Sequence, residues 1–232
     1  MEAVIICAGY GKRMDELTKD SQKCMLRFCG RPLVEFMLEN FMSAGVDAVH
    51  LVVGYKGDQV KEHFRYPQCG DIREAIHFIE QRPPYDSTAA ALLSAEGHAG
   101  KEFLYSHGDI ILRPEDVKHL YDTKLGGASA NVMLSTNPFT PETHMRATVK
   151  DGYVEEFYEA DVRQPDLMTY VGCDKLTREI FDFLPEDKCV SSALEAMARH
   201  GKRIAFTPLS TDWVHVVYKE DLDGQLPAVM PW

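Results

Sequence analysis

A glycine-rich turn directly after the first apolar segment carries the clearest chemical potential in this sequence. It reads Cys7-Ala8-Gly9-Tyr10-Gly11-Lys12-Arg13-Met14, and its small residues let backbone N–H groups approach phosphate oxygens closely. Lys12 and Arg13 stand inside the turn, and Lys23 follows ten residues after Arg13. Arginine can bind two phosphate oxygens at once and lysine supplies a point charge, so the cluster suits a triphosphate. An ordinary tight turn with solvated cations is the alternative that these residues leave open.

Two better-known phosphate-binding motifs do not fit this turn. A dinucleotide-binding loop requires G-x-G-x-x-G, but Met14 occupies the third glycine position. The P-loop pattern G-x-x-x-x-G-K-[ST] is also absent from the sequence. A nicotinamide or flavin site is therefore not expected here.

The overall composition restricts the class of partner. The 232 residues include 36 acidic and 25 basic side chains, which gives a net charge of −11 with histidine neutral. Such a chain repels nucleic acid and anionic membranes, so a local basic cluster must hold any phosphate ligand. No apolar stretch reaches the ~18 residues of a membrane helix, and no signal peptide is recognisable. We expect a cytoplasmic protein with reduced cysteines that binds neither nucleic acid nor membrane, and a homo-oligomer stays open.

Short apolar runs alternate with helical periodicity over the first half of the chain. The expected strands are Ala3–Ala8, Ala48–Val53, Ala75–Glu80 and Phe103–Ser106. The expected helices are Pro32–Ala44, Gly57–Phe64, Ser87–Ala95 and Pro114–Asp122. This alternation predicts a parallel sheet with helices on both faces.

The pattern changes after residue 125. Strands are expected at Ser129–Ser135, Arg146–Val149, Tyr153–Tyr158, Tyr170–Cys173, Arg203–Thr207 and Trp213–Val217. Helices are expected at Thr177–Leu184, Val190–Arg199 and from Lys219 to Leu222. No repeat or linker divides the chain, so we predict one domain over residues 1–232. Its fold class is α/β, a Rossmann-like three-layer sandwich with a mostly parallel mixed central sheet.

The N-terminal segment also resembles a known family. The stretch AVIICAGYGKRMDELTKDSQKCMLRFCGRPLVEFML combines a strand, small-small-Gly-x-Gly-x-Arg, a lysine about ten residues on, and Gly-x-Pro before an apolar helix. It resembles the signature of the sugar-1-phosphate nucleotidyltransferases, also called nucleoside-diphosphate-sugar pyrophosphorylases. The match has no gaps through Leu38, and weaker matches continue to about residue 222. The resemblance implies transfer of NMP from an NTP to a sugar-1-phosphate, with release of pyrophosphate and formation of an NDP-sugar.

By this resemblance, residues 1–125 bind the nucleotide and residues 126–224 bind the acceptor. The glycine turn would contact the base, ribose and phosphates through Ala8, Gly9, Gly11 and Lys12. Arg13 would hold the β- and γ-phosphates, and Lys23 would lie between the α-phosphate and the acceptor phosphate. A cation between two anions lowers their repulsion and stabilises the transition state. The proline that the family places before this lysine is Gln22 here.

Three further residues resemble the family's nucleoside contacts. Gln81 stands where the family often reads the base edge, and its amide weakly favours UTP or dTTP. Ser87 and Thr88 match a Gly-Thr-Ala motif at a helix start near the nucleoside. A plain N-cap by either hydroxyl is the alternative reading of that pair.

The metal site implied by the resemblance is incomplete. Asp109 matches the metal-binding Asn-Gly-Asp motif at a strand end and would hold Mg²⁺, with His107 as a neighbour. The second carboxylate of the family is replaced by His215. Asp109 could hold Mg²⁺ with phosphate oxygens and water, His215 could bind Mn²⁺, or Asp212 could move in; the first is favoured.

The acceptor side carries fewer matches. Glu159 could hydrogen-bond sugar hydroxyls, while the lysine expected after it is Ala160, so Arg146 is a candidate phosphate ligand. Gly172 matches a strand that lines the sugar pocket, and a β-bulge is its alternative reading. Two other functions stay open. One is a cytidylyltransferase for a small phosphorylated alcohol or phosphonate such as phosphocholine, and the other is a non-catalytic nucleotide- or sugar-sensing relative.

Overall fold

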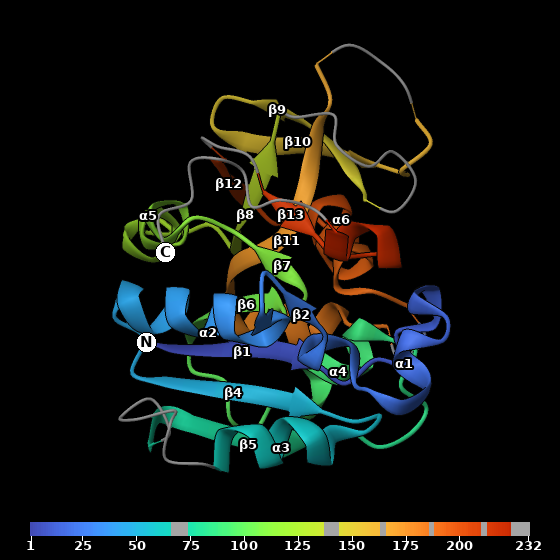
Figure 1. The fold of residues 1–232 in the computed structure, drawn as a ribbon. Coiled ribbons are helices and arrows are strands. Elements are labelled where there is room, and N and C mark those ends of the chain that lie inside the picture. The colour runs from blue at the N-terminus through green and yellow to red at the C-terminus, as the bar shows by residue number, and fades with distance from the viewer. Residues whose placement is uncertain (66–73, 137–143, 163–165, 186–187, 210–212, 224–232) are drawn as a thin grey trace.

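A nine-stranded mixed sheet forms the centre of the computed structural model, which describes residues 1–65, 74–136, 144–162, 166–185, 188–209 and 213–223 (Figure 1). Across the sheet the strands are β5 (Ile76–Glu80), β4 (Ala48–Val53), β1 (Glu2–Cys7), β6 (Glu102–His107), β11 (Met168–Thr177), β8 (Ala130–Ser135), β12 (Ile204–Pro208), β10 (Tyr153–Tyr158) and β9 (Arg146–Lys150). The order places β1 beside both β4 and β6.

The direction of pairing divides the sheet in two. Strands β5, β4, β1 and β6 pair in parallel, as the alternating pattern predicts. Strand β11 is antiparallel to both β6 and β8, and β10 is antiparallel to both β12 and β9. Among the strands of the described ranges, parallel pairing returns only between β8 and β12. The α/β class and the mixed sheet are confirmed. Parallel pairing dominates only in the N-terminal half of the sheet. The reason is that no crossover helix of the described residues leads into β11, which pairs antiparallel with β6.

Helices pack on both faces because alternate residues of β1 point to opposite sides. Ala3 and Ile5 share a buried cluster with α2 (Leu33–Ala44), α3 (Gly57–Arg65) and α5 (Pro114–Asp122). Val4 and Ile6 share a second buried cluster with α4 (Thr88–Ser94) and α6 (Val190–Arg199) on the opposite face. Figure 1 shows α2 running along β1. None of the helices in the described ranges has the length and apolar character needed to span a bilayer.

The ends of α2 follow from local sequence. Pro32 precedes the first helical residue, and Gly45 ends the helix in the left-handed conformation with a φ of 103°. The Gly45 N–H donates to the Met42 carbonyl at 3.1 Å, and the next N–H donates to the Phe41 carbonyl at 3.1 Å. Glycine adopts this conformation at little cost, which explains the stop at this position.

Strand β11 is longer than the predicted Tyr170–Cys173 because tertiary contacts bind polar residues inside it, although Asp174 Oδ1 has no partner among the described residues. Asp174 is fully buried and accepts a hydrogen bond from the Tyr170 hydroxyl at 2.5 Å. The Lys175 ammonium donates to the carbonyls of Tyr121 and Thr123 at 2.9 and 2.8 Å. These two polar residues interrupt the apolar pattern in the sequence without interrupting the strand.

Two predicted helices are 3₁₀ helices in the structure, and one predicted strand is much shorter. The segment predicted as Thr177–Leu184 forms η4 (Arg178–Phe183), and the last predicted helix forms η5 (Lys219–Asp223). The predicted strand Trp213–Val217 pairs only as β13 (Val214–His215), with the short β7 (Ile110–Ile111). Because its partner β7 has only two residues, β13 cannot extend further.

Short elements around the glycine turn were not predicted. They are η1 (Lys12–Met14), α1 (Leu17–Asp20), η2 (Lys23–Met25) and the hairpin of β2 (Arg27–Phe28) with β3 (Arg31–Pro32). Elements of two to four residues have too little periodicity to predict, although they carry the cations of the site.

Candidate active site

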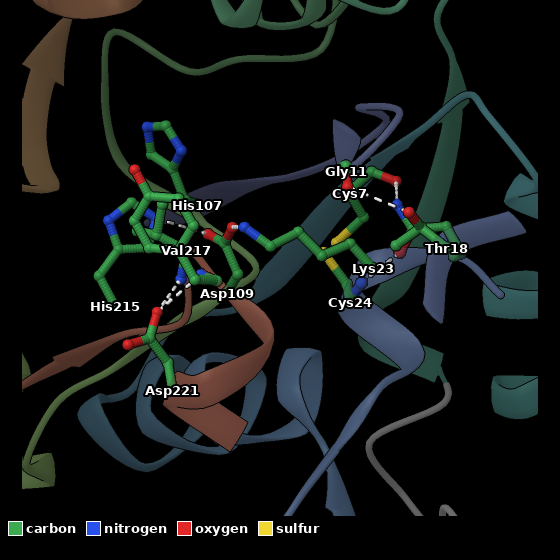
Figure 2. Close-up of polar contacts among 12 residues, drawn as sticks. Cys7, Gly11, Thr18, Lys23, Cys24, His107, Asp109, His215, Val217 and Asp221 are labelled. Carbon is green, nitrogen blue, oxygen red and sulfur yellow. Dashed lines mark hydrogen bonds and ion pairs between the residues drawn. The ribbon is translucent and has the colours of Figure 1, made fainter. Parts of the chain in front are cut away.

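A buried ion pair joins the turn after β1 to the end of β6. The Lys23 ammonium lies 2.5 Å from Asp109 Oδ2, and the two side chains are 15% and 12% exposed. Figure 2 shows the lysine extending from η2 toward the carboxylate. The two residues are 86 positions apart in the sequence, and the fold brings them into contact.

Gly108 makes this approach possible. A Cβ atom there would lie 2.6 Å from Cys7 Sγ and 2.9 Å from Cys24 Sγ, distances that real side chains do not show. The Gly108 N–H also donates to the Ile6 carbonyl at 3.0 Å, which continues the β1–β6 ladder. Only glycine lets the Lys23-Cys24 turn pack directly on the end of β6.

Electrostatics keep Asp109 ionised. Burial alone would raise the pKa of Asp109, but the charge of Lys23 and contacts with His215 outweigh it and hold that pKa well below its usual range. Asp109 Oδ1 is buried and accepts no hydrogen bond from the residues described. A buried carboxylate oxygen without a donor is a site where a cation gains binding energy.

His215 lies beside that oxygen. Its Nε2 is 3.4 Å from Asp109 Oδ1, and its Nδ1 is 2.6 Å from Nε2 of His144. The β7–β13 pairing sets this position, since it places His215 opposite Ile110 and lets the Val216 N–H donate to the Asp109 carbonyl at 3.0 Å. His144 is 5% exposed and was not predicted; it precedes β9, so no sequence spacing connects it to His215.

His107 completes a group of three donors. One ligand atom each from His107, Asp109 and His215 can be chosen so that all lie within 4.8 Å of one another. Burial lowers the pKa of His107 to about 4, with smaller effects of His215 and Lys23 in the same direction, so its imidazole is neutral. The His107 Nε2 also lies 2.9 Å from the Tyr105 hydroxyl. The three donors could hold a divalent cation, and two imidazoles with one carboxylate suit a transition metal better than Mg²⁺.

The glycine turn is shaped around Lys23. Gly11 has a φ of +66°, and a Cβ there would lie 2.8 Å from Thr18 Cγ2 and 3.1 Å from Lys23 Cβ. The Thr18 hydroxyl donates to the Gly11 carbonyl at 3.0 Å. Gly11 therefore permits both the turn and the close passage of Lys23, while the neighbouring Gly9 has no such crowding.

The two cations inside the turn are exposed. Arg13 lies in η1 with its side chain in solvent, where it is accessible to a phosphate. The Lys12 ammonium lies 3.7 Å from Asp86, and these side chains are 71% and 52% exposed. An exposed pair of this kind is weak, so an incoming phosphate can replace the carboxylate.

Gln22 takes over the anchoring at the position where the family has proline. Its side-chain amide donates to the Cys7 carbonyl at 2.6 Å, and its backbone N–H donates to Gln59 Oε1 at 2.7 Å. The side-chain oxygen also accepts from the Cys24 N–H, which caps η2. These contacts fix the turn before Lys23 to β1 and α3 without a proline ring.

The predicted nucleoside contacts already have partners within the fold. Ser87 Oγ accepts from the Ala90 N–H at 3.0 Å and donates to the Lys188 carbonyl at 2.5 Å, and Thr88 Oγ1 accepts from the Val190 N–H at 3.2 Å. The Ser87 hydroxyl thus caps α4, which agrees with the N-cap alternative, and the Thr88 hydroxyl binds α4 to the start of α6.

Gln81 keeps hydrogen-bonding groups available near the turn, whereas the Ala8 carbonyl is already bound. Gln81 is 5% exposed, and its amide donates one hydrogen bond to the Pro84 carbonyl at 3.1 Å. Its second N–H and its side-chain oxygen make no hydrogen bond with the described residues. Both groups can therefore recognise the edge of a base. The Ala8 carbonyl accepts from the Tyr55 N–H at 2.9 Å, which holds the turn against the loop after β4.

The predicted acceptor residues differ in burial and in the residues that they contact. Gly172 has a φ of +88°, and a Cβ there would lie 3.2 Å from His107 Cδ2. The register between β11 and β8 shifts around Gly172, so this residue lies in a β-bulge and also packs closely against His107. Glu159 is exposed just after β10, and Arg146 is buried with its guanidinium donating to Thr169 Oγ1 at 2.6 Å. Asp212 lies outside the described residues.

The fold and this site define a nucleotidyltransferase. Residues 3–149 match the MobA-like NTP transferase domain, and the chain belongs to that family. The matched segment includes the glycine turn, Lys23 and Asp109, whereas His215 lies beyond it. The resemblance noted in the sequence is confirmed.

Curated relatives and solved structures agree with this assignment. The bifunctional protein GlmU of Methanocaldococcus jannaschii is 28% identical over 190 residues, covering 81% of this chain and 43% of GlmU, so this chain spans less than half of that relative. A probable glucose-1-phosphate cytidylyltransferase of Bacillus subtilis is 28% identical over 209 residues, covering 81% and 79% of the two chains. The UTP–glucose-1-phosphate uridylyltransferase AglF of Haloferax volcanii is 25% identical, covering 96% and 94%.

Two solved structures share the fold. A UDP-glucose pyrophosphorylase complexed with UDP-glucose superposes with a TM-score of 0.81 at 18% identity and 95% coverage of both chains. The inositol-1-phosphate CTP transferase from T. maritima superposes with a TM-score of 0.79 at 20% identity, covering 95% of this chain and 90% of that one.

Proposed function

We propose that this protein transfers NMP from an NTP to a sugar-1-phosphate, releasing pyrophosphate and forming an NDP-sugar. The observation that carries the proposal is the buried Lys23–Asp109 pair, which lies between the glycine turn and the end of β6. Two relatives that cover most of this chain are named as glucose-1-phosphate cytidylyl- and uridylyltransferases, which supports a sugar-1-phosphate as the acceptor.

In the proposed reaction, an oxygen of the acceptor phosphate attacks the α-phosphorus in line. A new P–O bond forms while the bond between the α-phosphorus and the α–β bridging oxygen breaks, and pyrophosphate leaves with the electron pair. Lys23 balances the two anions that meet, Arg13 holds the β- and γ-phosphates, and the N–H groups of Gly9 and Gly11 face the phosphates. Catalysis is then positioning and charge stabilisation, with no covalent intermediate on the enzyme.

Asp109 positions Lys23 in the proposed reaction. Its carboxylate holds the Lys23 ammonium in a defined position before substrate binds, at a separation of 2.5 Å. The depressed pKa of Asp109 keeps that carboxylate charged throughout the neutral range. A preorganised cation does not need to be reoriented during the reaction, which lowers the barrier.

A divalent cation fits the group of His107, Asp109 and His215. The unsatisfied Asp109 Oδ1 and the neutral His107 are the observations that support the fit. The sequence favours Mg²⁺ on Asp109, but His215 beside this carboxylate supports Mn²⁺, which accepts imidazole more readily. When bound, such an ion would neutralise charge on the phosphates.

The remaining assignments are extensions of the same proposal. The helices on both faces of the sheet support a three-layer, Rossmann-like description. We also propose that residues 1–232 form one domain, with residues 1–125 binding nucleotide and residues 126–224 binding acceptor. The free cysteines of the described ranges support a cytoplasmic location.

Pyrophosphate release tests this function directly. Each nucleoside triphosphate is combined with a pool of sugar-1-phosphates or with phosphocholine, in Mg²⁺ and separately in Mn²⁺. We expect release that requires one triphosphate and the sugar pool, and that falls in Lys23→Met but not in the exposed control Lys118→Met. Release only with phosphocholine would assign the cytidylyltransferase alternative. Nucleotide binding without release in any well would assign the non-catalytic alternative and overturn the proposal.

A further inference from the structure

A second cluster of imidazoles lies away from the active site, toward the N-terminal ends of the parallel strands. His50 of β4 pairs across the sheet with His77 of β5, and their ring centroids are 5.4 Å apart. The ring of His98, which follows α4, lies 5.6 Å from that of His50. On β1, Val4 is paired with His50, so their side chains share a face of the sheet. Glu2 lies two residues before Val4, and its side chain is therefore on the same face as His50.

Several polar atoms of this cluster are buried without partners. His50 is 6% exposed, and both of its ring nitrogens lack a hydrogen bond. It is the only side chain within the described ranges with two such atoms. Glu2 Oε2 is also buried and unpartnered, and a Cβ on Gly100 would lie 3.2 Å from it. Buried polar groups nearly always have partners, so this concentration indicates a missing ligand.

The chemistry of the donors identifies the class of ligand. Three imidazoles and one carboxylate form the donor set typical of Zn²⁺ and neighbouring transition metals, whereas Mg²⁺ and Ca²⁺ prefer oxygen donors alone. Burial lowers the pKa of His50, which keeps its ring in the neutral form that a metal requires. His77 and His98 are exposed, so their rings can turn toward His50 at little cost.

We propose that Glu2, His50, His77 and His98 form a binding site for a divalent transition metal of the Zn²⁺ class. The donor atoms lie farther apart than those of the active-site group, which all lie within 4.8 Å, so binding draws His77 and His98 inward over His50. The bound ion would connect β1, β4, β5 and the segment after α4. The site is structural, because the glycine turn and Asp109 follow the opposite ends of β1 and β6.

Zn²⁺ binding to the full chain, measured by competition with a chromophoric chelator, tests this proposal. The double variant His77→Ala/His98→Ala changes exposed side chains only, so it preserves the core. We expect one Zn²⁺ site of the wild-type chain to weaken by more than about 100-fold in this variant, since loss of two ligands exceeds the usual effect of outer-sphere changes. His119→Ala, an exposed histidine of α5, is the matched control and should bind as wild type does.

His215→Ala separates this site from the active-site group. It should retain the site that His77→Ala/His98→Ala removes. Co²⁺ provides an independent readout, because a four-coordinate site gives strong visible absorption that should disappear in the double variant and persist in His215→Ala. Equal Zn²⁺ affinity and equal Co²⁺ spectra for the wild type and the double variant would overturn the proposal, and the unsatisfied atoms would then be assigned to buried water.

Discussion

Replacing Lys23 separates its contribution to stability from its contribution to catalysis. In Lys23→Met the side-chain volume is largely kept, but the buried Asp109 carboxylate loses the cation 2.5 Å away. Removing one partner of a buried ion pair costs roughly 3–5 kcal/mol, because the other charge stays buried without compensation. His215 Nε2 remains 3.4 Å from Oδ1, so we expect the lower end of that range.

The double variant Lys23→Met/Asp109→Asn provides the decisive comparison. It removes both charges, so its free energy of unfolding should return to within about 1 kcal/mol of wild type. Turnover should not recover, since the cation between the phosphates is still missing. Loss of one stabilising group of this kind lowers kcat by roughly 10²–10³-fold. Catalysis and stability are therefore affected differently by the second substitution.

Urea unfolding and pyrophosphate release at pH 7.5 measure the two effects on the same preparations. Lys118→Met, which breaks the exposed ion pair with Asp122 in α5, is the control and should change stability by less than about 1 kcal/mol. Our reasoning would be refuted if Lys23→Met were as stable as wild type, or if the double variant were no more stable than the single one. Full activity of Lys23→Met would refute the proposed function as well.

Three other substitutions give predictions from independent parts of the structure. Burial raises the pKa of Asp174 to about 7. Between about pH 4 and pH 7 the folded state therefore keeps a proton on Asp174 that the unfolded state has released. The free energy of unfolding falls as the pH rises through this window. Asp174→Asn should therefore gain roughly 3 kcal/mol relative to wild type between pH 5 and pH 8 in urea unfolding, and a pH-independent difference would contradict the raised pKa. His144→Ala removes the group that holds His215 Nδ1, so the Mn²⁺ concentration for half-maximal activity should rise about 10–100-fold, whereas an unchanged value would mean that His144 does not position His215. Gly11→Ala should lower kcat/KM at least about 10-fold because the added Cβ collides near Lys23, while Gly30→Ala, with a similar φ of +84° but open space, should retain activity; equal loss in both would point to backbone strain alone.

Much of the secondary structure could be predicted because it depends on local pattern. Strand β4, helix α5 and helix α6 begin and end at the predicted residues. Their apolar pattern is strong, broken in β4 only by His50, and Pro114 marks the start of α5 while Gly201 follows the end of α6. Strand β11 was underestimated because Asp174 and Lys175 look polar in sequence, and only the folded chain shows the partners that let them be buried.

The candidate site could be predicted only in part. The glycine turn and Lys23 belong to one contiguous signature, and Asp109 follows a predicted strand end, so the sequence selects these residues as candidates. The ion pair between Lys23 and Asp109 is visible only in the folded chain. The contact between His144 and His215 has no such signal, because it joins residues 71 positions apart through the pairing of two-residue strands. Ser87 and Thr88 show another limit of the sequence, since a motif that resembles nucleoside contacts also serves in helix capping and packing.

The sequence by itself therefore determined the α/β class, most helices and strands, the glycine turn after the first strand and the family. These features arise from interactions between residues close in the chain or from a motif that survives as a block. The tertiary structure decided which side chains meet: the antiparallel entry of β11, the imidazoles beside Asp109, and the buried His50 between His77 and His98. Such contacts depend on the relative placement of distant strands, and a single sequence does not specify that placement through any local preference.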